Sequence, residues 1–253
     1  AGVRKAERSG GVGMPPSVGD GSMIEQPWGL ARLPAMTTQP PSAPAEHLAV
    51  VHALRVFSES AEHAVDEAGR GACFGPVTIA ACVLPPRPIA QLDRLTDSKQ
   101  LAPSTRASLY DAICDVAESF AVVHISAAEI DRRGIQVANV DGARRAVAKL
   151  DARPGYVLVD ALRVPGLTAP QLPIIGGDYT ARCIAAASVL AKVSRDRLVT
   201  EMAQRYADYG IAGHKGYGTQ AHMAAVRRHG ASPEHRYSYA NVRQAHEYFM
   251  RSQ

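Results

Sequence analysis

The sequence predicts an α/β domain that continues into a helical C-terminal portion. Short apolar runs typical of buried strands come first, longer stretches with the helical spacing of apolar residues come later, and prolines and glycines separate them. The chain has 253 residues, of which 46% are hydrophobic. That is enough for one ordinary domain, or for one domain with appendages.

Residues 1–46 are predicted to be a disordered, Pro- and Gly-rich leader. Prolines and glycines recur there without a sustained apolar period, and such a segment buries too little apolar surface to offset the entropy of ordering it. Residues 47–253 are expected to form the folded domain. Within it, residues 48–57 are predicted to form a short helix or strand that leads into the first acidic motif.

Strands are predicted from the apolar runs. Residues 77–84 are too uniformly apolar to face water, which is typical of a buried strand, and Pro85 and Pro86 end it. Residues 121–125 and 156–160 are the other strand candidates. Helices are predicted where apolar residues recur on one helical face, at residues 104–119, 137–150, 184–206 and 219–229.

Charge and cysteine usage narrow the class of protein. The net charge is +4 and the sequence pI is about 9.0, which is compatible with a polyanionic partner. The four cysteines lack C-x-x-C spacing, so they fit a reduced, intracellular protein better than a disulfide framework or a zinc site. We see neither an apolar stretch of membrane-spanning length nor a secretory signal, and we expect a cytoplasmic protein that does not contact membranes.

The most informative motif is a pair of carboxylates, Asp66 and Glu67, followed by Gly69-Arg70-Gly71. Carboxylate oxygens suit hard cations such as Mg²⁺ and Mn²⁺, and the fixed fork of arginine donors matches phosphate oxygens. The flanking glycines let backbone N–H groups approach a ligand that side chains would exclude. The pattern indicates metal-assisted chemistry on a nucleic-acid phosphodiester, although the same residues also occur in ordinary solvated loops.

Two further carboxylates stand where ligands gather. Asp160 ends the apolar run of residues 156–160, and in α/β folds ligands bind at the carboxyl ends of strands. Asp178 follows two glycines just upstream of the long predicted helix, where the alternative is a helix N-cap or first-turn acid. Asp196 lies inside that helix between two arginines and is interpreted as structural.

Together, Asp66, Glu67, Asp160 and Asp178 would supply carboxylates from three segments. Hydrolysis of a phosphodiester by two metal ions roughly 4 Å apart needs about this much negative charge. Neighbours on a regular strand point to opposite faces, so Asp66 and Glu67 can share one site only if the strand ends or bends there. The glycines that follow favour such a break.

A glycine-rich loop at residues 213–219 contains Lys215 and Tyr217. Basic groups hold the nucleic-acid backbone and aromatic rings stack on sugars and bases, so this loop is a second candidate for substrate contact. The alternative is a surface loop that leads into a helix capped by Thr219.

Taken in order, these segments resemble the bacterial ribonuclease HII family, the type 2 branch of ribonuclease H. No single motif would be specific, but their number and order are. The matching motifs span roughly residues 64–240 and are Asp66-Glu67-Ala68-Gly69-Arg70-Gly71, Gly75-Pro76-Val77, Asp97-Ser98-Lys99-Gln100-Leu101, Val157-Leu158-Val159-Asp160, Gly177-Asp178, the stretch from Ile184 to Arg197, and His214-Lys215-Gly216-Tyr217-Gly218-Thr219.

The resemblance implies a ribonuclease H-like mixed sheet flanked by helices. It also implies an endonuclease that hydrolyses the phosphodiester on the 5′ side of ribonucleotides, in RNA–DNA hybrids and at single ribonucleotides in duplex DNA, leaving a 3′-hydroxyl and a 5′-phosphate. Mg²⁺ or Mn²⁺ would be held by Asp66, Glu67, Asp160 and Asp178.

The resemblance also assigns substrate contacts. The 2′-hydroxyl alone distinguishes RNA from DNA at one nucleotide, and Gly69, Arg70 and Gly71 match the segment that reads it. Tyr217 matches the tyrosine that stacks on the following deoxyribose. Lys99 and Lys215 lie in matching motifs as further contacts.

Two positions depart from the family pattern. Ala161 stands where a glycine usually follows the strand-end aspartate, and Gly177 stands where a lysine usually precedes the fourth aspartate. The missing lysine removes a charge partner for the carboxylates.

Other functions remain open. The main alternative is a non-catalytic protein that binds RNA–DNA hybrids; a hybrid-only nuclease is disfavoured by the intact Gly-Arg-Gly motif and Tyr217. We expect a monomer whose partner is nucleic acid, with no obligate protein partner. Residues 244–250 lack the spacing of a sliding-clamp peptide.

Overall fold

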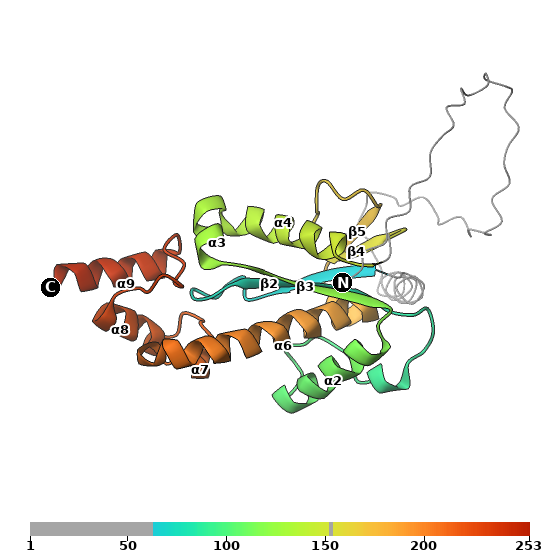
Figure 1. Ribbon diagram of the computed structural model, residues 1–253, viewed down its shortest axis with the longest axis horizontal. Helices are drawn as coiled ribbons and strands as arrows, with labels where there is room; N and C mark the ends of the chain where they lie inside the picture. The colour runs from blue at the N-terminus through green and yellow to red at the C-terminus, as the bar shows by residue number, and fades with distance from the viewer. Residues whose placement is uncertain (1–62, 152–153) are drawn as a thin grey trace, which may run out of the picture. The chain divides into compact units, whose positions relative to one another are not determined.

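A computed structural model describes residues 63–151 and 154–253 of the chain (Figure 1). The predicted leader at residues 1–46, the predicted element at residues 48–57 and the domain boundary at residue 47 lie outside these residues.

The described chain is built on a five-stranded mixed sheet with the strand order β3-β2-β1-β4-β5. Strand β1 pairs antiparallel with β2 and parallel with β4, while β3 extends one side and β5 the other. The strands are β1 (His63–Ala68), β2 (Val77–Val83), β3 (Ser119–Ile125), β4 (Val157–Asp160) and β5 (Gln171–Ile174).

Helices cover both faces of this sheet (Figure 1). Helix α4 (Ile135–Ala148) packs on one face and α6 (Arg182–Arg205) on the other, with α2 (Pro103–Val116) against α6. Each face of the sheet has its own hydrophobic core, one against α6 and one against α4. Successive strand residues point alternately into these two cores, because side chains of a pleated strand alternate between its faces. Ala64 packs on the α6 side of β1, and Val65 packs on the α4 side.

The chain ends in a helical portion, as predicted. Helices α8 (Gln220–His229) and α9 (Ala240–Arg251) pack together and follow α6 (Figure 1). Thr219 caps α8 by accepting the backbone N–H of His222, which confirms its predicted role. The remaining short elements are η1 (Ala90–Leu92), α3 (Ala127–Arg133), α5 (Gly177–Thr180), η2 (Ala207–Tyr209) and α7 (Ile211–His214).

The mixed sheet flanked by helices confirms the predicted fold class, and every predicted strand and helix within the described residues is present. The helix predicted for residues 104–119 is too long, because it ends at Val116 and Ser119 already begins β3. The Ser119 hydroxyl accepts the Asp151 N–H at 3.1 Å and so joins the start of β3 to the chain after α4. None of the described helices is long and apolar enough to cross a membrane.

Candidate active site

The fold brings the carboxyl ends of β1 and β4 together. These neighbouring strands run parallel, and Val65 stands level with Val159 in their register. Asp66 and Asp160 are the next residues of each strand, so they stand beside each other at the point where ligands bind in open α/β sheets. This placement agrees with the prediction made from the apolar run before Asp160.

The two strand ends open into a cavity of about 470 Å³. Its lining residues come from β1, β4, α2 and α6 and from the loops after β1, before α2 and before α8. They are Asp66, Glu67, Ala68, Gly69, Arg70, Gly71, Ser98, Lys99, Arg106, Asp160, Ser188, Lys192 and Tyr217.

Asp66 and Glu67 both reach this cavity although they are strand neighbours. Asp66 is buried and takes the α6 side of the sheet, the side of Ala64, whereas the half-buried Glu67 takes the other. Strand β1 ends one residue later, at Ala68, and Gly69 turns the chain with a φ of +85°. The Asp66 carboxylate accepts the Glu67 N–H at 2.6 Å, so the strand end holds the pair in place.

Asp178 lies in the first turn of α5 rather than at the start of the long helix, and it is buried. The Gly177 N–H donates to Asp160 Oδ1 at 3.0 Å, which joins α5 to the end of β4. Asp178 does not line the cavity itself, but its Oδ2 lies 3.8 Å from the ammonium of Lys99, which does.

The negative charges of the site carboxylates repel one another. Burial raises the pKa of Asp66 well above its usual range, and the charges of Glu67 and Asp160 raise it further. Burial likewise raises the pKa of Glu67, Asp160 and Asp178. The site thus concentrates negative charge that the protein itself leaves largely uncompensated, and this favours a bound cation.

Lys99 is a positive group of the cavity that pairs with Asp178. Its side chain is 79% exposed and stands 4.0 Å from Asp97 and 3.8 Å from Asp178. Its pKa is raised, because the neighbouring carboxylates outweigh the effect of partial burial.

The donor set suits a divalent cation. Within residues 63–151 and 154–253, no group of three or more His, Cys, Asp or Glu side chains already converges as metal ligands do. Carboxylate oxygens are nevertheless the ligands that Mg²⁺ and Mn²⁺ prefer. Burial and the neighbouring negative charges, which raise the pKa of these acids, also make neutralisation of their charge favourable. Their chemistry therefore fits the predicted metal.

The predicted ribose-reading segments lie in the cavity wall. Gly69, Arg70 and Gly71 line it directly after the carboxylate pair, and Tyr217 lines it from the loop before α8. The Arg70 guanidinium is exposed and donates to Gln136 at 2.6 Å. The Tyr217 ring is 38% exposed, which leaves it available for stacking.

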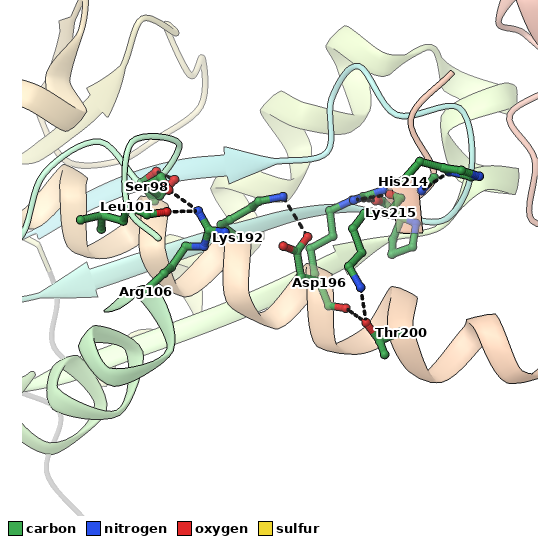
Figure 2. A network of polar contacts seen from close by, with 12 residues as sticks. Ser98, Leu101, Arg106, Lys192, Asp196, Thr200, His214 and Lys215 are labelled. Atoms are coloured by element: carbon green, nitrogen blue, oxygen red, sulfur yellow. Dashed lines mark hydrogen bonds and ion pairs between the residues drawn. The ribbon is translucent and has the colours of Figure 1, made fainter. Parts of the chain in front are cut away.

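Lys215 is the predicted contact that the structure does not bring into the cavity. Its ammonium donates to the Thr200 hydroxyl on α6 at 2.8 Å, as Figure 2 shows, and its backbone adopts a φ of +50°. Figure 2 also shows Lys192 paired with Asp196 at 2.9 Å, which confirms the structural interpretation of Asp196.

Ser98, Arg106, Ser188 and Lys192 line the cavity but were not predicted as site residues. Ser98 and Ser188 are hydrogen-bonded to each other at 2.8 Å. Ser188 and Lys192 are four residues apart on α6, a spacing that places two side chains on one helix face. With the knowledge that α6 packs against the carboxylates, this spacing would have identified Ser188 and Lys192 as cavity residues.

Structural comparison places the fold. The chain is similar to the crystal structure of ribonuclease H2 from Pyrococcus horikoshii OT3, with a TM-score of 0.64 and 27% identity over 74% of this chain and 98% of that one. The structure of Bst-RNase HIII in complex with Mn²⁺ has the same fold, with a TM-score of 0.56 and 18% identity over 77% of this chain and 73% of that one. The fold and the carboxylate-lined cavity define a nuclease of the ribonuclease H class.

Sequence comparison identifies the family. The ribonuclease HII family model matches residues 64–242. The chain is 67% identical over 182 residues to a ribonuclease HII of Corynebacterium efficiens, covering 72% of this chain and 79% of that protein. A ribonuclease HII of Corynebacterium diphtheriae is 62% identical over 186 residues, covering 74% of this chain and 81% of that protein. The chain belongs to the ribonuclease HII family and is a hydrolase.

Proposed function

We propose that this protein hydrolyses the phosphodiester on the 5′ side of ribonucleotides, both in RNA–DNA hybrids and at single ribonucleotides within duplex DNA. The products would carry a 3′-hydroxyl and a 5′-phosphate. The observation that carries the proposal is that Asp66, Glu67 and Asp160 line one cavity together with the Gly69–Gly71 segment and Tyr217. Groups suited to phosphodiester hydrolysis and groups suited to reading a ribose stand side by side.

Asp66, Glu67, Asp160 and Asp178 would hold two divalent cations, Mg²⁺ or Mn²⁺. Such cations, when bound, activate a water molecule and stabilise the departing oxygen. The protein's own contribution is to fix Asp66, Glu67 and Asp160 at the ends of two paired strands and Asp178 in α5, which the Gly177 N–H joins to Asp160. Lys99 stands at the mouth of the cavity, where its exposed ammonium can contact a substrate phosphate.

Recognition of the ribonucleotide would fall to the Gly69–Gly71 segment and Tyr217, which line the same cavity. Gly69 and Gly71 flank Arg70 and carry no side chain, so their backbone N–H and C=O groups can closely approach a 2′-hydroxyl. The half-exposed Tyr217 ring offers a flat surface for the next sugar. Together they would place the scissile phosphate against the carboxylates.

The test uses a labelled DNA duplex that carries one ribonucleotide, an RNA–DNA hybrid and an all-DNA duplex. We expect nicking 5′ of the ribonucleotide that requires Mg²⁺ or Mn²⁺, stops with chelator and is absent from the all-DNA duplex. Asp160→Asn should abolish it, whereas Asp111→Asn, a change at an exposed aspartate on α2, should not.

Tight binding without nicking would instead support the non-catalytic hybrid-binding function, because binding alone should survive the chelator. We further propose a monomeric, cytoplasmic enzyme, and size-exclusion chromatography with light scattering tests its oligomeric state.

A further inference from the structure

Two arginines are completely buried and bind the loops that carry Gly69–Gly71 and Tyr217. Arg195 belongs to α6 and Arg236 lies between α8 and α9, and each is 0% exposed. Neither forms an ion pair with a carboxylate of the described residues. Burying a charge without a partner is costly unless hydrogen bonds compensate it, so the groups that these guanidiniums bind are informative.

Arg195 binds backbone carbonyls from both substrate-facing loops. Its Nε donates to the Pro76 carbonyl at 3.0 Å and its Nη2 to the Phe74 carbonyl at 3.1 Å, on the segment that follows Gly71. Its Nη1 donates to the Lys215 carbonyl at 3.0 Å, two residues before Tyr217. The guanidinium also lies 5.6 Å from the centre of the Tyr217 ring. One side chain thus sets the distance between the two loops.

Arg236 holds the Gly-Arg-Gly segment itself. Its Nη1 donates to the Arg70 carbonyl at 2.9 Å and its Nε to the Gly75 carbonyl at 3.1 Å. The Tyr239 hydroxyl donates to the same Arg70 carbonyl at 2.6 Å and accepts from Arg236 Nη1 at 2.9 Å. The Arg70 carbonyl is therefore held from two sides.

The hydrogen bonds to the Arg70 carbonyl also fix the direction of the next backbone donor, the Gly71 N–H. In a planar trans peptide the C=O and the following N–H point in opposite directions. Holding the Arg70 carbonyl toward the buried Arg236 therefore turns the Gly71 N–H the other way. Gly71 is exposed and lines the cavity, and its N–H makes no hydrogen bond to any described residue. That donor is free for a ligand.

We propose that Arg195 and Arg236 are positioning residues for ribonucleotide recognition. They hold the Gly69–Gly71 backbone and the Tyr217 loop at one spacing and turn the Gly71 N–H toward the substrate sugar. This inference rests on the proposed function, and it adds residues that never touch substrate but decide which substrate is cut.

The role predicts an unequal effect on two substrates. A duplex with a single ribonucleotide offers one 2′-hydroxyl, so the reading groups must stand in register with the carboxylates. An RNA–DNA hybrid offers a 2′-hydroxyl at every nucleotide of the RNA strand. A displaced Gly69–Gly71 backbone can therefore still contact one of them. Loss of positioning should therefore lower single-ribonucleotide cleavage more than hybrid cleavage, whereas a merely structural defect should lower both in parallel.

The experiment measures kcat and KM of the full chain on both substrates for wild type, Arg195→Lys and Tyr239→Phe. Arg195→Lys keeps the charge but loses the fork that binds three carbonyls, and Tyr239→Phe removes only the hydroxyl on the Arg70 carbonyl. Arg197→Lys is the matched control, because Arg197 lies two residues away on α6 with a half-exposed side chain paired to Asp111.

For Arg195→Lys we expect kcat on the single-ribonucleotide duplex to fall by up to about 100-fold, the effect of misplacing a substrate by about 1 Å. For Tyr239→Phe we expect a fall of about threefold to tenfold, the size of one lost hydrogen bond. In both, KM should change little and the ratio of single-ribonucleotide to hybrid cleavage should drop, while Arg197→Lys should match wild type.

Circular dichroism at the assay temperature shows which variants are folded. If Arg195→Lys does not fold, the milder Tyr239→Phe decides. Equal losses on both substrates, or no loss, would overturn the positioning role while leaving the proposed function intact. If the wild type nicks neither substrate, the proposed function fails, and this inference fails with it.

Discussion

Gly69 and Gly71 look equivalent in the sequence, but the structure predicts opposite outcomes when each is changed to alanine. Gly69 has a φ of +85°, and a Cβ there would stand 1.9 Å from Arg195 Nε and 2.7 Å from Arg195 Cζ. Gly71 has no positive φ, and a Cβ there would meet nothing within 4 Å. Gly69→Ala should therefore destabilise the fold, and Gly71→Ala is its matched control.

The size of the effect follows from two contributions. A left-handed backbone costs a residue with a Cβ roughly 1–2 kcal/mol. The new methyl group also displaces the Arg195 guanidinium from at least one of its three carbonyl acceptors, and a hydrogen bond to a charged group contributes about 1.5–3 kcal/mol. Gly69→Ala should thus lower the free energy of unfolding by roughly 2.5–5 kcal/mol, whereas Gly71→Ala should stay within about 0.5 kcal/mol.

Urea unfolding followed by circular dichroism measures both variants, and thermal unfolding provides a second estimate. A domain of this size shifts its Tm by about 2–4 °C per kcal/mol, so Gly69→Ala should melt roughly 5–20 °C below wild type. Equal stability of the two variants would refute the packing of Arg195 against Gly69, and with it the reason that this position requires glycine.

Further outcomes follow from the same contacts. Asp66→Asn should abolish nicking and yet raise the Tm at pH 7, because burial and neighbouring carboxylates raise the Asp66 pKa and so make its charged form unfavourable; a lower Tm would contradict this. Tyr217→Ala should strongly reduce single-ribonucleotide cleavage while Tyr217→Phe retains it, and equal loss in both would count against stacking. Burial lowers the pKa of His222 to about 4 and of His235 to about 3 from 6.5. Between about pH 6.5 and these lowered values the unfolded chain binds the extra protons, so each histidine should contribute a loss of stability of about 1.4 kcal/mol per pH unit as the pH falls; urea titrations should show a smaller slope for His235→Gln. Ala161 has a φ of +44°, so Ala161→Gly should be neutral or stabilising by up to about 1 kcal/mol, and a clear loss in urea would contradict strain at this position.

Strands and helices with a strong local pattern were predictable. The uniform apolar run of β2 and the helical spacing along α4 and α6 identify these elements within a few residues. Strand β1 carries two carboxylates within six residues, and β5 contains a proline. Neither has an apolar run of its own, because pairing with β4 and its neighbours, rather than local composition, makes each of them a strand.

The candidate site divides in the same way. The carboxylate at the end of β4 could be placed from its apolar run, since a strand end is a local feature. Lys215 was predicted as a substrate contact, and this stays a prediction; a left-handed turn places its ammonium on Thr200, outside the cavity lining, which no local pattern indicated. Ser188 and Lys192 were overlooked, because which face of α6 meets the cavity depends on how the helix packs on the sheet.

The sequence by itself determined the chemistry of this protein, since carboxylates, a glycine-flanked arginine and a tyrosine keep their intrinsic properties wherever they stand. Only the tertiary structure decided that these groups meet. Parallel pairing of β1 with β4 sets Asp66 beside Asp160, and buried Arg195 joins two loops far apart in the chain. Such contacts depend on packing between distant segments, which no local pattern of residues records.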